Sequence, residues 1–76
     1  MEEREMILGM IANKVSSDKM NGMSTKRAFE NINQRSRELM AENEITVADL
    51  VDCLVSKRKL IGYSEKEIEL LKSKVK

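Results

Sequence analysis

The sequence predicts an all-helical fold, a small bundle of four helices of which three are long and the C-terminal one is short. Apolar residues recur at the helical spacing of 3.6, and no stretch alternates apolar and polar residues long enough to form a strand. Helix-capping sequences stand at three internal joints, and the chain contains no proline. A length of 76 residues is that of one domain, so residues 1–76 are expected to form a single helical domain.

The first helix is predicted over residues 2–19. Its first turn is acidic, which suits the positive N-terminal end of a helix dipole. The dipeptide Asn21-Gly22 is expected to end it, because glycine readily takes the left-handed conformation found after a helix. The apolar residues that share one face of this segment are Ile7, Leu8, Ile11 and Val15.

The second helix is predicted over residues 25–42, with Ser24 as its N-cap. One side of this segment is densely polar, and the other is expected to face the core. The core-facing residues are Ala28, Phe29, Ile32, Leu39 and Met40.

The third helix is predicted over residues 47–61, and Gly62 is expected to be its C-cap. Thr46 and Asp49 have the spacing of a capping box, with Asp in place of the usual Glu. Arg58 falls within the apolar stripe, where its stem would cover the core while its charge reaches water. The apolar members of that stripe are Val47, Leu50, Val51, Leu54, Val55 and Ile61.

A short fourth helix is predicted over residues 65–75. Ser64 and Glu67 form a capping box at its start. Its narrow apolar face consists of Ile68, Leu71 and Val75.

Several kinds of chemistry have no residues to support them in this sequence. The chain has no histidine, the commonest general base and transition-metal ligand, and neither of the common glycine-rich phosphate-binding loops. The single Cys53 lies next to Asp52 near the apolar stripe, and we interpret it as a packing residue. We therefore expect no enzymatic activity, no cofactor, no metal and no small-molecule substrate.

The location of the chain is also constrained. No apolar run approaches the roughly 18 residues of a membrane-spanning helix, so no membrane association is expected. The first residues are mainly acidic, unlike the basic start of a signal peptide. A cytoplasmic protein is the expectation.

One candidate protein-binding surface lies on the first helix. Met6 and Met10 fall roughly 100° or more from the centre of its apolar stripe, and Gly9 beside them would permit a close approach. Methionine is favoured where a surface must adapt to another. The alternative is a first helix buried on two sides. A homodimer is a further open possibility, because association stabilises small domains.

The polar side of the second helix supplies further candidate contacts to a protein partner through Arg27, Gln34 and Arg37. With Met6 and Met10, they lead us to expect a non-catalytic module that binds and modulates another macromolecule. Small helical proteins of this size commonly act as inhibitors, antirepressors or immunity-type regulators, an analogy of fold and size.

The alternative expectation is a nucleic-acid-binding regulator, since Arg, Asn and Gln contact base edges and phosphates. A net charge of +1 is low for a dedicated nucleic-acid binder, and acidic residues share the same surface. The candidate nucleic-acid contacts are Arg27, Asn31, Gln34, Arg35, Arg37, Lys57, Arg58 and Lys59.

Overall fold

A computed structural model describes residues 2–74 of the chain, and these residues are helical without strands. The all-helical prediction is confirmed, but the described residues form five helices instead of four. The predicted end of the last helix at Val75 lies outside the described residues. The helices are α1 (Glu2–Met20), α2 (Thr25–Glu30), α3 (Gln34–Glu42), α4 (Val47–Ser56) and α5 (Glu65–Lys74).

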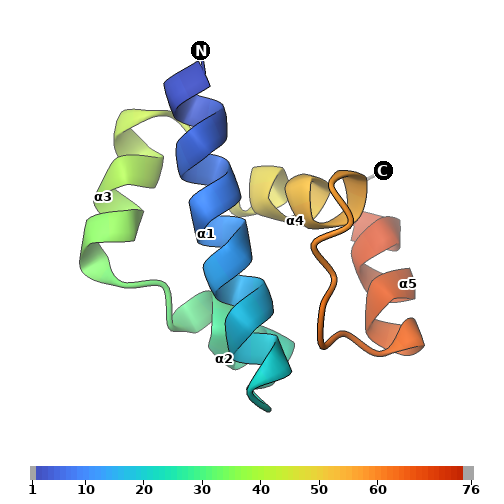
Figure 1. Cartoon of the computed structure of the whole chain (residues 1–76). Coiled ribbons are helices and arrows are strands. Elements are labelled where there is room, and N and C mark those ends of the chain that lie inside the picture. Colours follow the sequence, from blue (N-terminus) through green and yellow to red (C-terminus); the bar gives the residue numbers. More distant parts are fainter. Residues whose placement is uncertain (1, 75–76) are drawn as a thin grey trace.

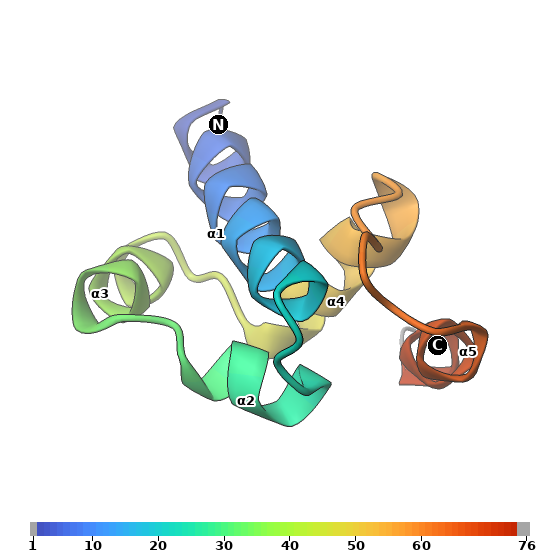
Figure 2. The same ribbon diagram turned by 60° about the horizontal axis from the view of Figure 1, so that its bottom comes forward.

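Helix α1 is the central element of the fold (Figure 1). It packs against α2, α3 and α4, while α5 packs against α4 at the edge of the molecule. Figure 2 shows α3 and α4 on opposite sides of α1, with one side of α1 left without a helix over it. The principal-axis extents are 32 × 25 × 15 Å, so the fold is flat. Because a helix is about 10 Å across, a molecule this thin leaves large helix faces at the surface.

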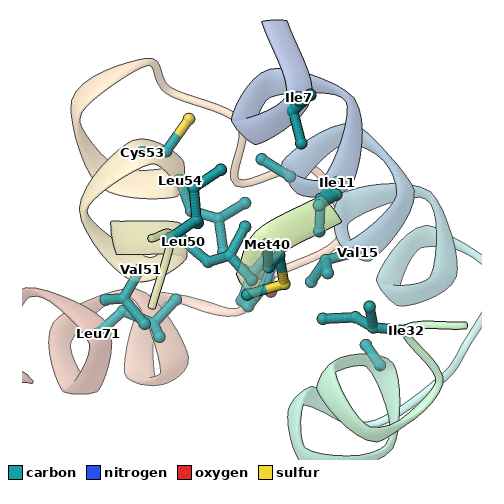
Figure 3. Packing of buried hydrophobic residues seen from close by; sticks show 14 residues of the cluster. Ile7, Ile11, Val15, Ile32, Met40, Leu50, Val51, Cys53, Leu54 and Leu71 are labelled. Atoms are coloured by element: carbon teal, nitrogen blue, oxygen red, sulfur yellow. The ribbon is translucent and has the colours of Figure 1, made fainter. Parts of the chain in front are cut away.

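The core lies where α1 meets the other helices, with Met40 of α3 and Leu50 of α4 near its centre (Figure 3). Leu50, Leu54 and Val15 are the largest side chains that are completely buried. Most predicted stripe residues lie in this core or pack against it. Core residues outside the predicted stripes are Ala12, Ile45, Cys53 and Tyr63.

The predicted second helix is wrong in one respect: the chain leaves the helical conformation between Asn31 and Asn33. Asn33 is the N-cap of α3, and its side-chain oxygen accepts a hydrogen bond of 2.8 Å from the backbone N–H of Ser36. Ile32 inserts into the core from this break and is buried. Asparagine favours helix ends over helix interiors because its side chain bonds to nearby backbone groups. The helical spacing of apolar residues continues across this break, so the sequence pattern alone does not show that α2 ends and α3 begins there.

The predicted third helix is also shorter than expected, since α4 ends at Ser56 and not at Ile61. Arg58 follows with φ of 56°, and the N–H of Lys59 donates to the carbonyl of Leu54 over 2.9 Å. This is a Schellman ending with arginine in the left-handed position that glycine usually occupies. Arg58 is therefore exposed beyond the helix and is not part of its apolar stripe.

The predicted capping residues at the three joints are confirmed. Ser24 accepts from the backbone N–H of Arg27, and Thr46 forms a capping box with Asp49. At the start of α5, Ser64 and Glu67 exchange side-chain to backbone hydrogen bonds of 3.2 and 3.3 Å. Each cap satisfies backbone N–H groups that have no partner inside their helix. Local sequence therefore determines where these helices begin.

Gly62 has a role different from the predicted C-cap of α4. It lies in the loop before α5, has φ of 85° and packs against the last turn of α1. A Cβ atom at this position would lie 2.6 Å from the backbone nitrogen of Met20.

Two residues predicted to lie in the core are exposed. Val47 is 54% exposed and Ile61 is 56% exposed.

Among the described residues, no helix combines the length and apolar character needed to cross a membrane.

Candidate protein-binding surface

A continuous uncharged stripe runs along the outer side of α1. Its methionines Met6, Met10 and Met20 are 66%, 59% and 62% exposed. Asn13 and Ser17 between them are exposed, and Gly9 is half-buried. Spacings of three and four residues place all six on one side of the helix. At a rise of 1.5 Å per residue, the stripe is about 21 Å long.

This stripe lies opposite the core. At 100° per residue, its centre is about 180° from the buried face formed by Ile11 and Val15. The absence of charge from the stripe is informative, because charged residues make up 36% of the chain. An outward helix face is ordinarily polar and charged. The outer side of α1 therefore differs from the solvated face expected of a bundle helix.

Gly9 has no role in the packing of its own chain. A Cβ placed at Gly9 would have no neighbouring atom within 4 Å, so an alanine would fit without displacement. Glycine inside a helix is less favourable than alanine by about 1 kcal/mol. The chain accepts this cost at the middle of α1, between the two most N-terminal methionines of the stripe.

A shallow groove between α1 and α4 adjoins Gly9. Leu8, Gly9 and Cys53 supply its apolar part, and charged side chains such as Glu5 and Lys57 line its edges. Cys53 is buried, and burial raises the pKa of its thiol above the ordinary value. These observations agree with the interpretation of Cys53 as a packing residue, since a reactive thiol needs a lowered pKa.

The polar residues predicted to face a partner from residues 25–42 are largely engaged within the chain. The guanidinium of Arg37 donates to the carbonyl oxygens of Ile32 and Glu30 over 2.9 and 3.0 Å. It thereby satisfies carbonyl groups at the break between α2 and α3. The side-chain amide of Asn31 donates to Asp18 over 3.2 Å.

The remaining candidates from this segment differ in how available they are. Gln34 donates to Glu38 over 3.4 Å, and Arg35 forms an ion pair of 3.7 Å with the same carboxylate. Arg27 is exposed and has no ion pair among the described residues. Of the residues predicted on this polar side, Arg27 and the 70% exposed Arg35 keep a charge that is available to a ligand.

The predicted basic run forms the loop after α4. Lys57 and Arg58 are exposed, while Lys59 donates to the side-chain oxygen of Asn13 over 2.9 Å. This loop lies beside the C-terminal half of α1 and shares a groove there with Met20. Arg27 lines separate grooves at the start of α2. The structure therefore does not gather the nucleic-acid candidates into one basic surface.

A polar junction that the sequence did not reveal connects α1 to α5. The ammonium group of Lys19 donates to both carboxylate oxygens of Glu67 at 2.8 and 2.7 Å, and the Thr25 hydroxyl donates to the same carboxylate. These hydrogen bonds, with Lys19 contributing most, lower the pKa of Glu67 to about 2. The Lys19 ammonium also lies 5.0 Å from the centre of the Tyr63 ring. Burial raises the pKa of Tyr63 to about 12.

Two further polar contacts hold α1 to its neighbours. Arg4 donates to Asp49 over 3.0 Å and to the backbone carbonyl of Asn43 over 3.2 Å, which connects α1 to the segment before α4. The buried Asp18 accepts from Lys14 and Asn31, and these bonds hold the pKa of its carboxyl below the ordinary value. Because Arg4, Asp49 and Asp18 are satisfied inside the chain, they are structural and not candidate binding residues.

Comparison of the chain with known protein families, with curated proteins and with solved structures found no match. The described residues form a small all-helical fold in which the outer side of α1 is exposed and uncharged.

Proposed function

We propose that this chain is a non-catalytic protein-binding module that modulates another macromolecule through the outer stripe of α1. The observation that carries the proposal is the exposure of Met6, Met10 and Met20 on one uncharged side of the central helix. Exposed apolar side chains that lie together on a surface, as Met6 and Met10 do, often mark a protein–protein interaction site. An inhibitor, an antirepressor or an immunity-type regulator would act in this way.

The side chains of the stripe suit a protein partner. Methionine is flexible and polarisable, so it adapts to an irregular apolar surface. The stripe is straight and about 21 Å long, which matches an extended contact with another helix. A small-molecule ligand would need a deep concave site that encloses it, whereas the methionines of this face are about three-fifths exposed.

The non-catalytic part of the proposal is supported by the carboxylates with perturbed pKa values. Asp18, Asp49 and Glu67 each have a lowered pKa, and each accepts hydrogen bonds from residues of its own chain. A catalytic acid or base is expected to be poised near neutral pH and to face a substrate. These three carboxylates instead stabilise the connections between helices.

The test is replacement of Met6 and Met10 by aspartate. The double variant is expected to lose capture of its protein partner from native-cell extract while keeping its helical circular dichroism and its unfolding midpoint. Leu70→Asp is the matched control, since Leu70 is 61% exposed on α5. The proposal is contradicted if the double variant captures the same proteins as the unaltered chain.

The alternative, nucleic-acid binding, has support from the exposed charges of Arg27, Lys57 and Arg58. It is the weaker proposal, because Arg37 and Asn31 are engaged internally and the remaining charges lie on separate grooves. Binding of this kind would weaken steeply with salt. A mobility-shift titration at low salt that shows no bound species would exclude it.

A further inference from the structure

We infer that the stripe of α1 binds the same stripe of a second copy of this chain, with the two helices antiparallel and crossing at Gly9. This inference rests on the proposed function and names the partner of the same surface. Three independent features of α1 support it: the glycine, the charges beside the stripe, and the groove next to the glycine.

The first feature is Gly9 itself. Glycine lowers helix stability, and a Cβ placed at this position would meet no atom within 4 Å, so the fold does not need a glycine here. A side chain limited to hydrogen allows the backbone of another helix to approach closely. Met6 and Met10, on either side of Gly9, would then pack around the crossing point.

The second feature is the charge on one flank of the stripe. Glu3 and Lys14 lie on the same side of α1, eleven residues apart in the sequence, which is about 16 Å along the helix. They are too far apart to interact within one copy. The midpoint between them falls next to Gly9, so an antiparallel crossing there places Glu3 of each copy beside Lys14 of the other.

Lys14 keeps the capacity for this contact although it already binds Asp18. Its side chain is 53% exposed, and an ammonium group has three donors, of which the Asp18 carboxylate oxygens accept two. A parallel pairing would instead bring this flank of one copy against the other flank of the second copy, with Glu3 near Glu5 and Lys14 near the basic loop that contains Lys57 and Arg58. Charge on this flank therefore selects the antiparallel arrangement.

On the opposite flank of the stripe, acidic and basic groups also lie at opposite ends. Glu5 is exposed near the N-terminal end of the stripe, and the basic loop that contains Lys57 and Arg58 lies beside its C-terminal half. In an antiparallel pair, the acidic end of each copy faces the basic loop of the other. Opposite charges therefore meet on both sides of the contact, which favours this orientation.

The third feature is the groove between α1 and α4. It begins at Gly9 and has Leu8 and Cys53 as apolar lining. A methionine from the second copy can enter this groove, because its unbranched side chain fills irregular spaces. The crossing thus gives Met6 and Met10 an apolar environment that one copy alone does not supply.

The first experiment measures the mass of the chain by sedimentation equilibrium from micromolar to millimolar concentrations. The expected result is a monomer–dimer equilibrium whose dissociation constant rises at least tenfold in Gly9→Leu. Gly9→Ala is expected to raise the unfolding midpoint of the monomer and yet weaken the dimer, a combination that a purely structural glycine would not produce. Leu70→Asp is the control and should dimerise normally.

The second experiment determines the orientation through disulfide formation in a Cys53→Ser background. Met10→Cys lies next to the proposed axis and is expected to cross-link to its counterpart. Met20→Cys is not, because the two copies of residue 20 would lie about 33 Å apart. Equal cross-linking of both variants would indicate a parallel pair and overturn the inference.

The outcomes also separate this inference from the proposed function. A chain that is monomeric at every concentration, or a Gly9→Leu variant that dimerises like the unaltered chain, overturns the second-copy inference. If such a monomer still loses capture of a different protein on replacement of Met6 and Met10, the proposed function stands. If the chain is monomeric and its capture of other proteins does not depend on Met6 and Met10, both the second-copy inference and the proposed function fail.

Discussion

Replacement of Gly62 by alanine tests the packing of the last loop on α1. The new Cβ would lie 2.6 Å from the backbone nitrogen of Met20 and 2.8 Å from the carbonyl carbon of Lys19. Backbone atoms within a helix cannot rotate away, so the loop or α1 must move. A clash of this kind typically costs about 1–3 kcal/mol. The positive φ of 85° adds about 1 kcal/mol for a residue with a Cβ.

The expected loss in the free energy of unfolding is thus about 2–4 kcal/mol, measured by urea denaturation followed by circular dichroism. Gly22→Ala is the matched control, because Gly22 also has a positive φ of 98° but no atom within 4 Å of the position that a Cβ would take. It should lose only about 1 kcal/mol. If Gly62→Ala is no more destabilising than Gly22→Ala, the loop does not pack on α1 as described.

Two further predictions concern stability. Because the pKa of Glu67 falls from 4.5 to about 2 on folding, its contribution is present above pH 4.5 and lost as the pH falls toward 2. Its size is at most about 3 kcal/mol, and Glu67→Gln should reduce the difference in unfolding free energy between pH 7 and pH 3; an unchanged difference would refute this. Arg58→Gly should stabilise the chain by about 0.5–1 kcal/mol in the same assay, since Arg58 has φ of 56°. Lys57→Gly should give no such gain, because Lys57 at the C-cap has φ of −94°. Equal gains from the two variants would contradict the left-handed conformation of Arg58.

The starts of α2, α4 and α5 could be predicted because they depend on nearby residues, whereas the start of α3 after Asn33 was missed. Ser24, Thr46 and Ser64 cap helices through partners three residues away, and those pairs are legible in the sequence. The predicted helix ends near Met20 and at Glu42 agree with the ends of α1 and α3. The end of α4 was harder to predict, since Arg58 takes a left-handed conformation at a position without glycine. Half-buried residues follow Arg58 directly, so tertiary packing outweighs the local backbone preference.

The methionines of the candidate surface could be predicted from local sequence, but the contacts of the polar residues could not. Helical periodicity alone places Met6 and Met10 outside the core stripe, and the structure finds them exposed. The engagement of Arg37 and Asn31 within the chain depends on the break between α2 and α3, which the periodicity did not reveal. The junction of Lys19 with Glu67 joins residues 48 apart in sequence, a contact that no local pattern encodes.

The most direct test of the central claim is photo-cross-linking from position 10. A photoreactive side chain in place of Met10 is expected to form a covalent protein adduct in native-cell extract, whereas the same side chain in place of Leu70 is not. An adduct of twice the mass of the chain would identify a second copy as the partner, and another mass would identify a different protein. The absence of any adduct from position 10, or equal adducts from both positions, would contradict the account of α1 as the binding surface.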